Sequence, residues 1–260
     1  MSAHTDIPHE QVPAPVRLGV AGWTVRREHA HFFSDGGSHL ERYATLFNAV
    51  EINSCFHRPH RFATYQRWAA TVPDDFRFAV KLSRVITHTN RFVDITAPLE
   101  RFLGEIAGLG PKLGPVLVQL PPSFAYAKPL VRSFFDELRL RFDGQVVLEP
   151  RHETWFTARV DQLLVGYRVA RVAADPARVF AAAEPGGHDR VVYLRLHGSP
   201  RIYYSAYPAD YLEDVARLLA DSASRDIPTW CIFDNTTLGA ATVDALAVKS
   251  RLFNSRRVTT

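Results

Sequence analysis

The stretch QVVLEPR, residues Gln145–Arg151, is a short apolar run that ends in charged residues. A stretch with helical periodicity follows it along the chain. The same order recurs through the sequence, and nearly every run ends in a charged or amide residue. The seven other runs are RLGVAGW (Arg17–Trp23), AVEIN (Ala49–Asn53), RFAVK (Arg77–Lys81), PVLVQ (Pro115–Gln119), RVAAD (Arg171–Asp175), VVYLRLHG (Val191–Gly198) and TWCIFDNT (Thr229–Thr236).

Eight strand–helix units in 260 residues predict an α/β protein with a single (β/α)8 TIM-type barrel. In such barrels the chemistry lies at the carboxyl ends of the strands, which we call the mouth. The polar residues of the eight runs lie at those ends. The helical patterns cover residues Ser38–Phe47, Phe62–Thr71, Pro98–Leu109, Pro129–Leu140, Thr157–Tyr167, Ala177–Ala183, Ala209–Ser222 and Leu238–Lys249.

Composition predicts one globular domain over residues 17–260, after a flexible polar tail at residues 1–16. Hydrophobic residues make up 47% of the chain and charged residues 22%, as in ordinary globular domains. No apolar run approaches the roughly 18 residues of a membrane span, and the first residues lack the pattern of a secretory signal. We therefore expect a cytoplasmic protein that does not enter membranes and has no evident obligate protein partner.

The net charge and the cysteine content narrow the function classes further. A net charge of +4 permits an anionic partner, such as a small molecule or a nucleic acid, without requiring one. Cys55 and Cys231 are the only cysteines, too few for a disulfide framework or a Cys-rich zinc site. We expect both to be buried thiols.

Strand parity predicts which side chains point into the barrel, because successive residues of a strand face opposite sides. In AVEIN, Val50 and Ile52 share the face under the helices, so Glu51 and Asn53 point inward. The same argument applied to the other runs predicts a set of inward polar residues at the mouth. Asp175 also ends a strand, but the alternation there is too weak to place it. The set is Glu51, Asn53, Lys81, Gln119, Glu149, Arg151, Asp175, Arg195, His197 and Asp234.

This set has two interpretations. Three positive and four negative side chains are expensive to bury unless they are paired. They could therefore form a mutually satisfied network that only closes the top of the barrel. A barrel can be filled with Val, Ile and Leu at lower cost, which favours a functional site.

Carboxylates suggest two kinds of chemistry. Glu51 and Glu149 could act as general acid and general base. A metal would instead use residues that end neighbouring strands, namely Glu149, Asp175, His197 and Asp234. This mixture of oxygen and imidazole ligands suits zinc, manganese or magnesium, although no HxH or HExxH spacing accompanies it.

Basic residues suggest a third kind of chemistry. Lys81, Arg151 and Arg195, with His88 or His152, would match a phosphate or a carboxylate group. The alternative role of these cations is to form salt bridges with the carboxylates of the same set. The sequence leaves both roles open.

The ordered motifs of the chain resemble the YecE-like family, catalogued as domain of unknown function 72. They run from Leu18 to Ala247 and read GVAGW, FNAVEINSCFHRP, RWAATVPDDFRFAVKLSRVITH, LGPVLVQLPPSF, VLEPRHETW, YLRLHG and FDNTTLGAA. The resemblance implies a TIM-type barrel and carries no established reaction. Beyond the residues named above, the family's signature positions match Thr87, Trp155, Gly198 and Asn235.

Together these observations predict an enzyme that acts on a phosphate-bearing substrate at the mouth, a nucleotide, a nucleic acid or a sugar phosphate. The reaction expected is acid–base or metal-assisted hydrolysis. The expected catalytic residues are Glu51, Glu149, His197 and Asp234. The expected substrate-binding residues are Asn53, Lys81, His88, Gln119, Arg151, His152, Trp155, Arg195 and Asn235. The alternative is a non-catalytic protein that binds an anionic small molecule or nucleic acid at the same place.

Overall fold

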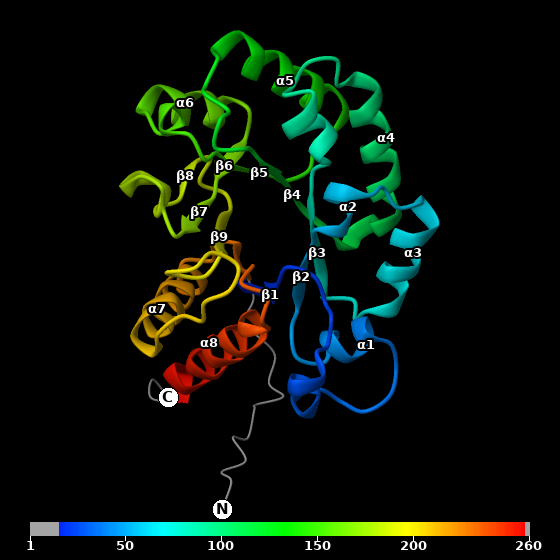
Figure 1. Ribbon diagram of the computed structural model, residues 1–260, viewed down its shortest axis with the longest axis vertical. Coiled ribbons are helices and arrows are strands. Elements are labelled where there is room, and N and C mark those ends of the chain that lie inside the picture. Colours follow the sequence, from blue (N-terminus) through cyan, green and yellow to red (C-terminus); the bar gives the residue numbers. More distant parts are fainter. Residues whose placement is uncertain (1–15, 258–260) are drawn as a thin grey trace, which may run out of the picture.

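The computed structural model describes residues 16–257, in which helices surround parallel strands (Figure 1). The predicted tail lies outside the described residues, except for Val16, which begins the first strand. The strands are β1 (Val16–Val20), β2 (Ala49–Ile52), β3 (Arg77–Lys81), β4 (Leu113–Gln119), β5 (Val146–Glu149), β6 (Val169–Arg171), β7 (Ala173–Asp175), β8 (Gly186–Gly187), β9 (Val192–Leu196) and β10 (Thr229–Phe233). The α-helices are α1 (His39–Ala44), α2 (Ser54–His57), α3 (Phe62–Thr71), α4 (Thr96–Ile106), α5 (Lys128–Arg141), α6 (Ala158–Gly166), α7 (Ala209–Ser224) and α8 (Ala240–Arg257).

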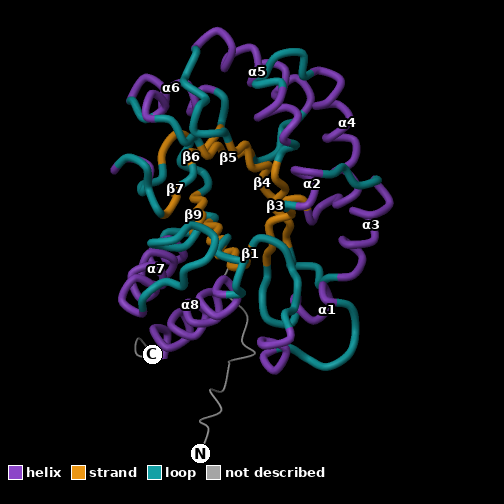
Figure 2. The backbone as a smooth tube through the Cα atoms, viewed as in Figure 1, coloured by secondary structure: helices purple, strands orange, loops and turns teal. Residues whose placement is uncertain are grey.

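The strands form two sheets. One has the order β1-β10-β9-β7, and the other has the order β2-β3-β4-β5-β6-β8. Neighbouring strands run parallel except β6 and β8, which are antiparallel. The protein is therefore a mixed α/β fold with parallel sheets, and Figure 2 shows the strands of both sheets around a common centre with the helices outside them.

Each of the eight predicted runs contains a strand, but the sixth unit differs from the prediction. Its strand is divided at Val172, so that β6 pairs with β5 and β7 pairs with β9. The helix predicted over Ala177–Ala183 is wrong, because only Phe180–Ala182 forms a short 3-10 helix. Gly186 and Gly187 then pair antiparallel with β6.

A tyrosine hydroxyl links the neighbouring strands β1 and β2. The hydroxyl of Tyr43 accepts a hydrogen bond from the backbone N–H of Val20 at 2.8 Å and donates to the carbonyl of Ala49 at 2.9 Å. Gly19 makes room for this arrangement, since a Cβ there would lie 2.0 Å from the Ala49 carbonyl oxygen. The hydroxyl thus takes the place of direct backbone pairing.

An asparagine side chain makes a similar link nearer the start of β1. Asn48 accepts from the N–H of Leu18 at 3.0 Å and donates to the carbonyl of Val16 at 2.9 Å. One direct backbone bond follows at the carboxyl end, from Gly22 N–H to the Glu51 carbonyl at 2.9 Å. The edge of one sheet is thereby connected to the edge of the other.

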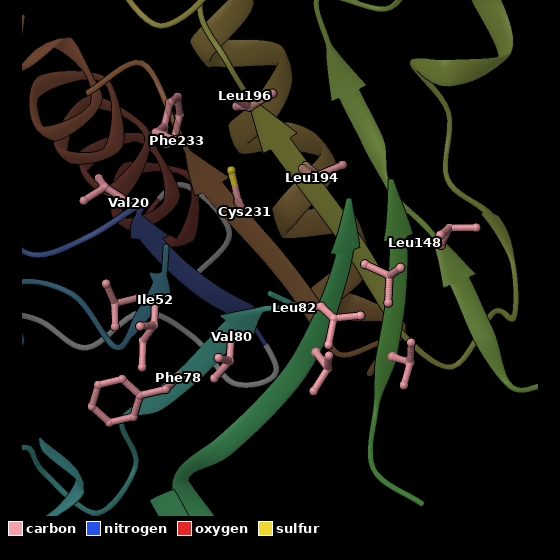
Figure 3. Close-up of a cluster of buried hydrophobic side chains, with 14 of the residues drawn as sticks. Val20, Ile52, Phe78, Val80, Leu82, Leu148, Leu194, Leu196, Cys231 and Phe233 are labelled. Atoms are coloured by element: carbon pink, nitrogen blue, oxygen red, sulfur yellow. The ribbon is translucent and has the colours of Figure 1, made fainter. Parts of the chain in front are cut away.

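Two layers of apolar side chains confirm the predicted strand parity. The larger layer lies between strands and helices and includes residues such as Ile52, Val80, Leu148 and Leu196, seen in Figure 3. A smaller cluster lies on the opposite face of the strands, with the parity of the predicted polar residues. It consists of Ala49, Ala79, Leu117, Val147, Ala170, Val172, Val191, Tyr193, Trp230 and Ile232. The polar residues therefore lie one step further along the same strands.

Candidate functional site

The guanidinium of Arg195, on β9, contacts three carboxylates at the ends of the strands. Its Nη2 lies 2.7 Å from Oε1 of Glu51 and 2.9 Å from Oδ2 of Asp234, and its Nη1 lies 3.2 Å from Oε2 of Glu149. Burial opposes the charge of Arg195, but these carboxylates outweigh burial and raise its pKa well above the usual value. Arg195 is fully buried, and the protein's own carboxylates engage the donors that we predicted for a substrate.

Glu149, at the end of β5, accepts hydrogen bonds from three further side chains. Gln119 donates from Nε2 at 3.1 Å, Arg151 donates from Nε at 3.0 Å, and Nε2 of His197 lies 3.0 Å from Oε1. Burial by itself favours the protonated acid, but Arg151, His197 and Arg195 together hold the pKa of Glu149 well below its usual value. Glu149 is therefore an ionised carboxylate at neutral pH, which can accept a proton but has none to donate.

The imidazole of His197 lies between two carboxylates. Its Nδ1 is 3.0 Å from Oδ2 of Asp234, while Nε2 faces Glu149. Nε2 also lies 3.1 Å from Nη2 of Arg151, so the ring contacts a guanidinium as well as two carboxylates. Burial opposes the charge of Asp234, but Arg195 and His197 lower its pKa. Asn53 donates to the other oxygen of Asp234 over a longer 3.4 Å.

Tyr193 is a residue of this site that the sequence analysis missed. Its hydroxyl donates to Oε2 of Glu51 at 2.7 Å, next to Arg195. Both Tyr193 and Glu51 are buried, so the carboxylate of Glu51 is satisfied inside the protein. Parity could have identified Tyr193, since it precedes Arg195 by two positions and faces the same side.

Lys81, at the end of β3, differs from the other cations of the site. Only 8% of the residue is exposed, and within residues 16–257 no acceptor lies within hydrogen-bonding distance of its Nζ. The ammonium instead lies 4.2 Å from the centre of the Phe56 ring. Burial and then Arg195 lower the pKa of Lys81 to about 8, against the opposing effect of nearby carboxylates. Lys81 is therefore a largely buried amine that loses its proton more readily than an ordinary lysine.

His88 indicates a positive electrostatic field beside Lys81. Its ring lies 5.0 Å from that of Phe56, and its Nδ1 is 2.8 Å from the hydroxyl of Thr87. Burial, and after it the charges of four neighbouring cations, lower the pKa of His88 to about 4. These are Lys81, Arg84, Arg151 and Arg91.

Three predicted binding residues have other partners in the structure. Trp155 is fully buried, and its indole N–H donates to the carbonyl of Phe124 at 2.7 Å. His152 accepts from the backbone N–H of Thr154 at the start of a short 3-10 helix. Asn235 is buried and donates to Asp244 at 2.7 Å and to the carbonyl of Ser205 at 2.8 Å. The contacts of all three hold loops in place.

The four predicted metal ligands do not come together as a ligand set. The carboxylates of Glu149 and Asp234 face Arg195 and the two nitrogens of His197. The backbone carbonyl of Asp175 accepts from the backbone N–H of His197 at 2.7 Å and from the hydroxyl of Tyr207 at 3.1 Å. Across the part of the chain that the structure describes, no group of three or more His, Cys, Asp and Glu side chains is arranged to hold a metal ion.

Comparison with known proteins gives the family. The model of the family described as "Protein of unknown function DUF72" matches residues 17–259. This chain belongs to that family. It is 30% identical over 142 residues to the "UPF0759 protein YecE" of Escherichia coli strain K12, and the same figures hold for that of Escherichia coli O157:H7. The match covers 54% of this chain, and the chain spans about half the length of these curated relatives, 50%.

Crystal structures of DUF72 family proteins share the fold. The protein of Enterococcus faecalis V583 superimposes with a TM-score of 0.77 over 92% of this chain and 95% of that chain. The protein of Thermotoga maritima MSB8 gives a TM-score of 0.75 over 92% and 99% of the two chains. Both are 21% identical to this DUF72 chain. Within its described residues, no helix is long and apolar enough to cross a bilayer.

Proposed function

We propose that this DUF72 protein is an enzyme that hydrolyses a phosphate-bearing substrate at the mouth, with Lys81 as the central residue. The substrate class is a nucleotide, a nucleic acid or a sugar phosphate. We also infer that the two sheets form a single (β/α)8 barrel, in which β6 and β7 together count as one strand. The observation that carries the functional proposal is the largely buried side chain of Lys81, whose ammonium has no ion-pair partner among residues 16–257.

The proposed anion site uses Lys81 and Arg151 rather than Arg195. A largely buried cation without a direct ion-pair partner is costly, and a phosphate bound beside Lys81 would supply such a partner. The guanidinium of Arg151 is partly exposed, with 17% of its side chain accessible, and can turn its remaining N–H groups to a phosphate oxygen. The cations around His88 add to the positive field there. Arg195 acts as a positioning residue beneath this site.

The proposed proton donor is also Lys81. A donor works best when its pKa lies near the pH at which it operates, and the pKa of Lys81 is about 8. Glu149, which we predicted from the sequence as a proton-exchanging group, is held ionised by its three basic neighbours. It is better suited to keeping Arg151 and His197 in place. Asn53 has a buried Oδ1 with no hydrogen-bond partner among the described residues, which is free to accept from a substrate hydroxyl.

A second candidate function is non-catalytic binding of an anionic small molecule or nucleic acid. The observation that favours it is the mutual neutralisation of the charge cluster, which we define as Glu51, Glu149, Arg151, Arg195, His197 and Asp234. Groups that satisfy one another hold a rigid rim but are less free to exchange protons. Only the enzyme would convert its substrate to product, so an assay of hydrolysis distinguishes the two functions.

Phosphate binding and hydrolysis test the proposal directly. Calorimetry with inorganic phosphate and assays with bis(4-nitrophenyl) phosphate and 4-nitrophenyl phosphate would compare the wild type with Lys81→Met and Arg151→Met. We expect each variant to weaken phosphate binding at least about tenfold, the loss of one charge-assisted contact. Lys128→Met, which removes an exposed lysine, is the matched control and should bind normally.

The outcomes divide the alternatives. Binding that depends on Lys81, together with hydrolysis, supports the enzyme. Binding that depends on Lys81 without hydrolysis of either ester supports the binding protein. Equal binding by wild type and Lys81→Met would contradict both. For a nucleic acid ligand, affinity should fall steeply with added salt, whereas a small phosphate ester should respond weakly.

A further inference from the structure

Lys81 has surroundings that no other lysine of this chain has. The chain contains four lysines, at positions 81, 112, 128 and 249. Lys112 donates to the carbonyls of Ala69 and Val72, and Lys249 donates to the carbonyl of Leu46. Lys128 is exposed. Lys81 alone is buried with no hydrogen-bond acceptor in reach within residues 16–257.

We propose that the ε-amine of Lys81 forms an imine with a small aldehyde or ketone that carries an anionic group. This inference goes beyond hydrolysis and does not depend on it, because it requires only the amine and the groups around it. Lysines desolvated against apolar groups or placed near another cation are the ones that react with carbonyl compounds. Lys81 has both features, with Phe56 at 4.2 Å and Arg195 acting on it electrostatically.

The covalent step balances without any added reagent. The neutral Nζ attacks the carbonyl carbon, a C–N bond forms, and the proton that the nitrogen loses goes to the carbonyl oxygen. The resulting hydroxyl then leaves as water together with the second hydrogen of the nitrogen, and the nitrogen–carbon double bond forms. Protonation of the imine from solvent gives an iminium cation, which takes the place of the ammonium over the Phe56 ring. The charge that Glu51, Glu149 and Asp234 face is therefore unchanged.

The cations around the amine define the anionic group of the substrate. Arg151 and Arg84 act together with Lys81 on His88, so two guanidinium groups and the amine contribute to the same positive potential. A carboxylate or phosphate close to the carbonyl carbon would face these guanidinium groups, which bind such anions bidentately. Small keto acids and phosphorylated aldehydes or ketones meet both conditions.

Borohydride trapping with site mapping tests the proposal in the wild-type protein. Pyruvate, dihydroxyacetone phosphate and uncharged glycolaldehyde would each be incubated with the protein at pH 7 and reduced, and the labelled lysines would be identified by peptide mass spectrometry. With a pKa of about 8, Lys81 has a neutral fraction on the order of a hundred times that of an ordinary lysine at this pH. We expect Lys81 to be labelled at least about tenfold faster than exposed Lys128, allowing for its burial.

Lys249 is the internal control. Its pKa is also lowered by burial to about 8, yet its Nζ is bonded to a carbonyl, so it should stay unlabelled. Arg151→Met should slow labelling of Lys81 by pyruvate and dihydroxyacetone phosphate by a larger factor than labelling by uncharged glycolaldehyde. If Lys81 is labelled no faster than Lys128 with all three compounds, the proposal is overturned, whether or not the protein hydrolyses phosphate esters.

Discussion

The guanidinium of Arg195 and the carboxylate of Glu51 form an ion pair in which both side chains are completely buried, with 2.7 Å between Nη2 and Oε1. Removing one member of a buried pair leaves the other charge uncompensated. We therefore expect Arg195→Met to lower the free energy of unfolding by about 3–5 kcal/mol, measured by urea denaturation. Glu51→Leu should have a cost of similar size.

The double variant gives the sharper result for this pair. Arg195→Met combined with Glu51→Leu should lower the free energy of unfolding by less than the sum of the single changes, because neither charge is then left buried without its partner. Arg217→Met is the control, since Arg217 pairs with Asp214 on the surface with 70% of its side chain exposed, and such pairs contribute about 0–1 kcal/mol. Strict additivity would mean that the two buried groups do not stabilise each other.

Acid should unfold the protein through the carboxylates of the charge cluster. The pKa of Glu149 is lowered below its usual 4.5 and that of Asp234 below its usual 3.8. A carboxylate with a lowered folded-state pKa contributes stability that is present above the unfolded-state value and lost as the pH falls through the folded-state value. The free energy of unfolding should therefore fall as the pH drops below about 4.5.

Glu149→Gln isolates one carboxylate in this acid transition. The variant cannot titrate at position 149, so its stability should depend less steeply on pH below about 4.5 than that of the wild type. Glu153→Gln, an exposed change on the next loop, should leave the slope as it is. Parallel curves for wild type and Glu149→Gln would show that another group dominates acid unfolding.

Strand periodicity made much of the site predictable. A strand places every second side chain on one face, so the alternation in AVEIN and VVYLRLHG was enough to put Glu51 and Arg195 on the same side. The structure brings them into direct contact. Neither this ion pair nor its complete burial could be predicted. Residues 144 positions apart meet only through the curvature of the sheets.

Residues outside the strands were less predictable. Trp155 and His152 lie in a connection that has no periodicity, so nothing in the sequence indicated that the indole would turn inward to bond the carbonyl of Phe124. The missing sixth helix has a similar origin. Its expected segment, Ala177–Ala183, lies between two strands that continue the sheets, and tertiary pairing overrides weak helical propensity there.

Alkaline pH should strengthen the fold through Lys81. Its pKa is lowered from the usual 10.5 to about 8, so between these values the unfolded chain binds more protons than the folded protein. Stability therefore rises with pH across this window. Between pH 8 and pH 10.5 the free energy of unfolding of the wild type should rise, relative to that of Lys81→Met, by up to about 3 kcal/mol. Lys249 is common to both proteins and cancels in the comparison.

Denaturation of wild type and Lys81→Met at several pH values measures this gain. Lys128→Met provides the exposed control, whose difference from wild type should not vary with pH in this range. A constant difference between wild type and Lys81→Met would mean that the amine of Lys81 titrates as it does in the unfolded chain. Burial would then not lower the pKa of Lys81, and the proposed reactivity of its amine would lose that support.

The hydroxyl of Tyr43 should be a main stabiliser of the junction between β1 and β2. Tyr43→Phe leaves the N–H of Val20 and the carbonyl of Ala49 without their partner, and each unsatisfied buried group costs about 1–3 kcal/mol. Tyr167→Phe is the matched control, because the Tyr167 hydroxyl bonds Asp136 at an exposed position. Hydrogen exchange supplies the local readout. In Tyr43→Phe the amide of Val20 should exchange faster than global unfolding explains, and unchanged protection of that amide would mean that the Tyr43 hydroxyl does not stabilise this junction.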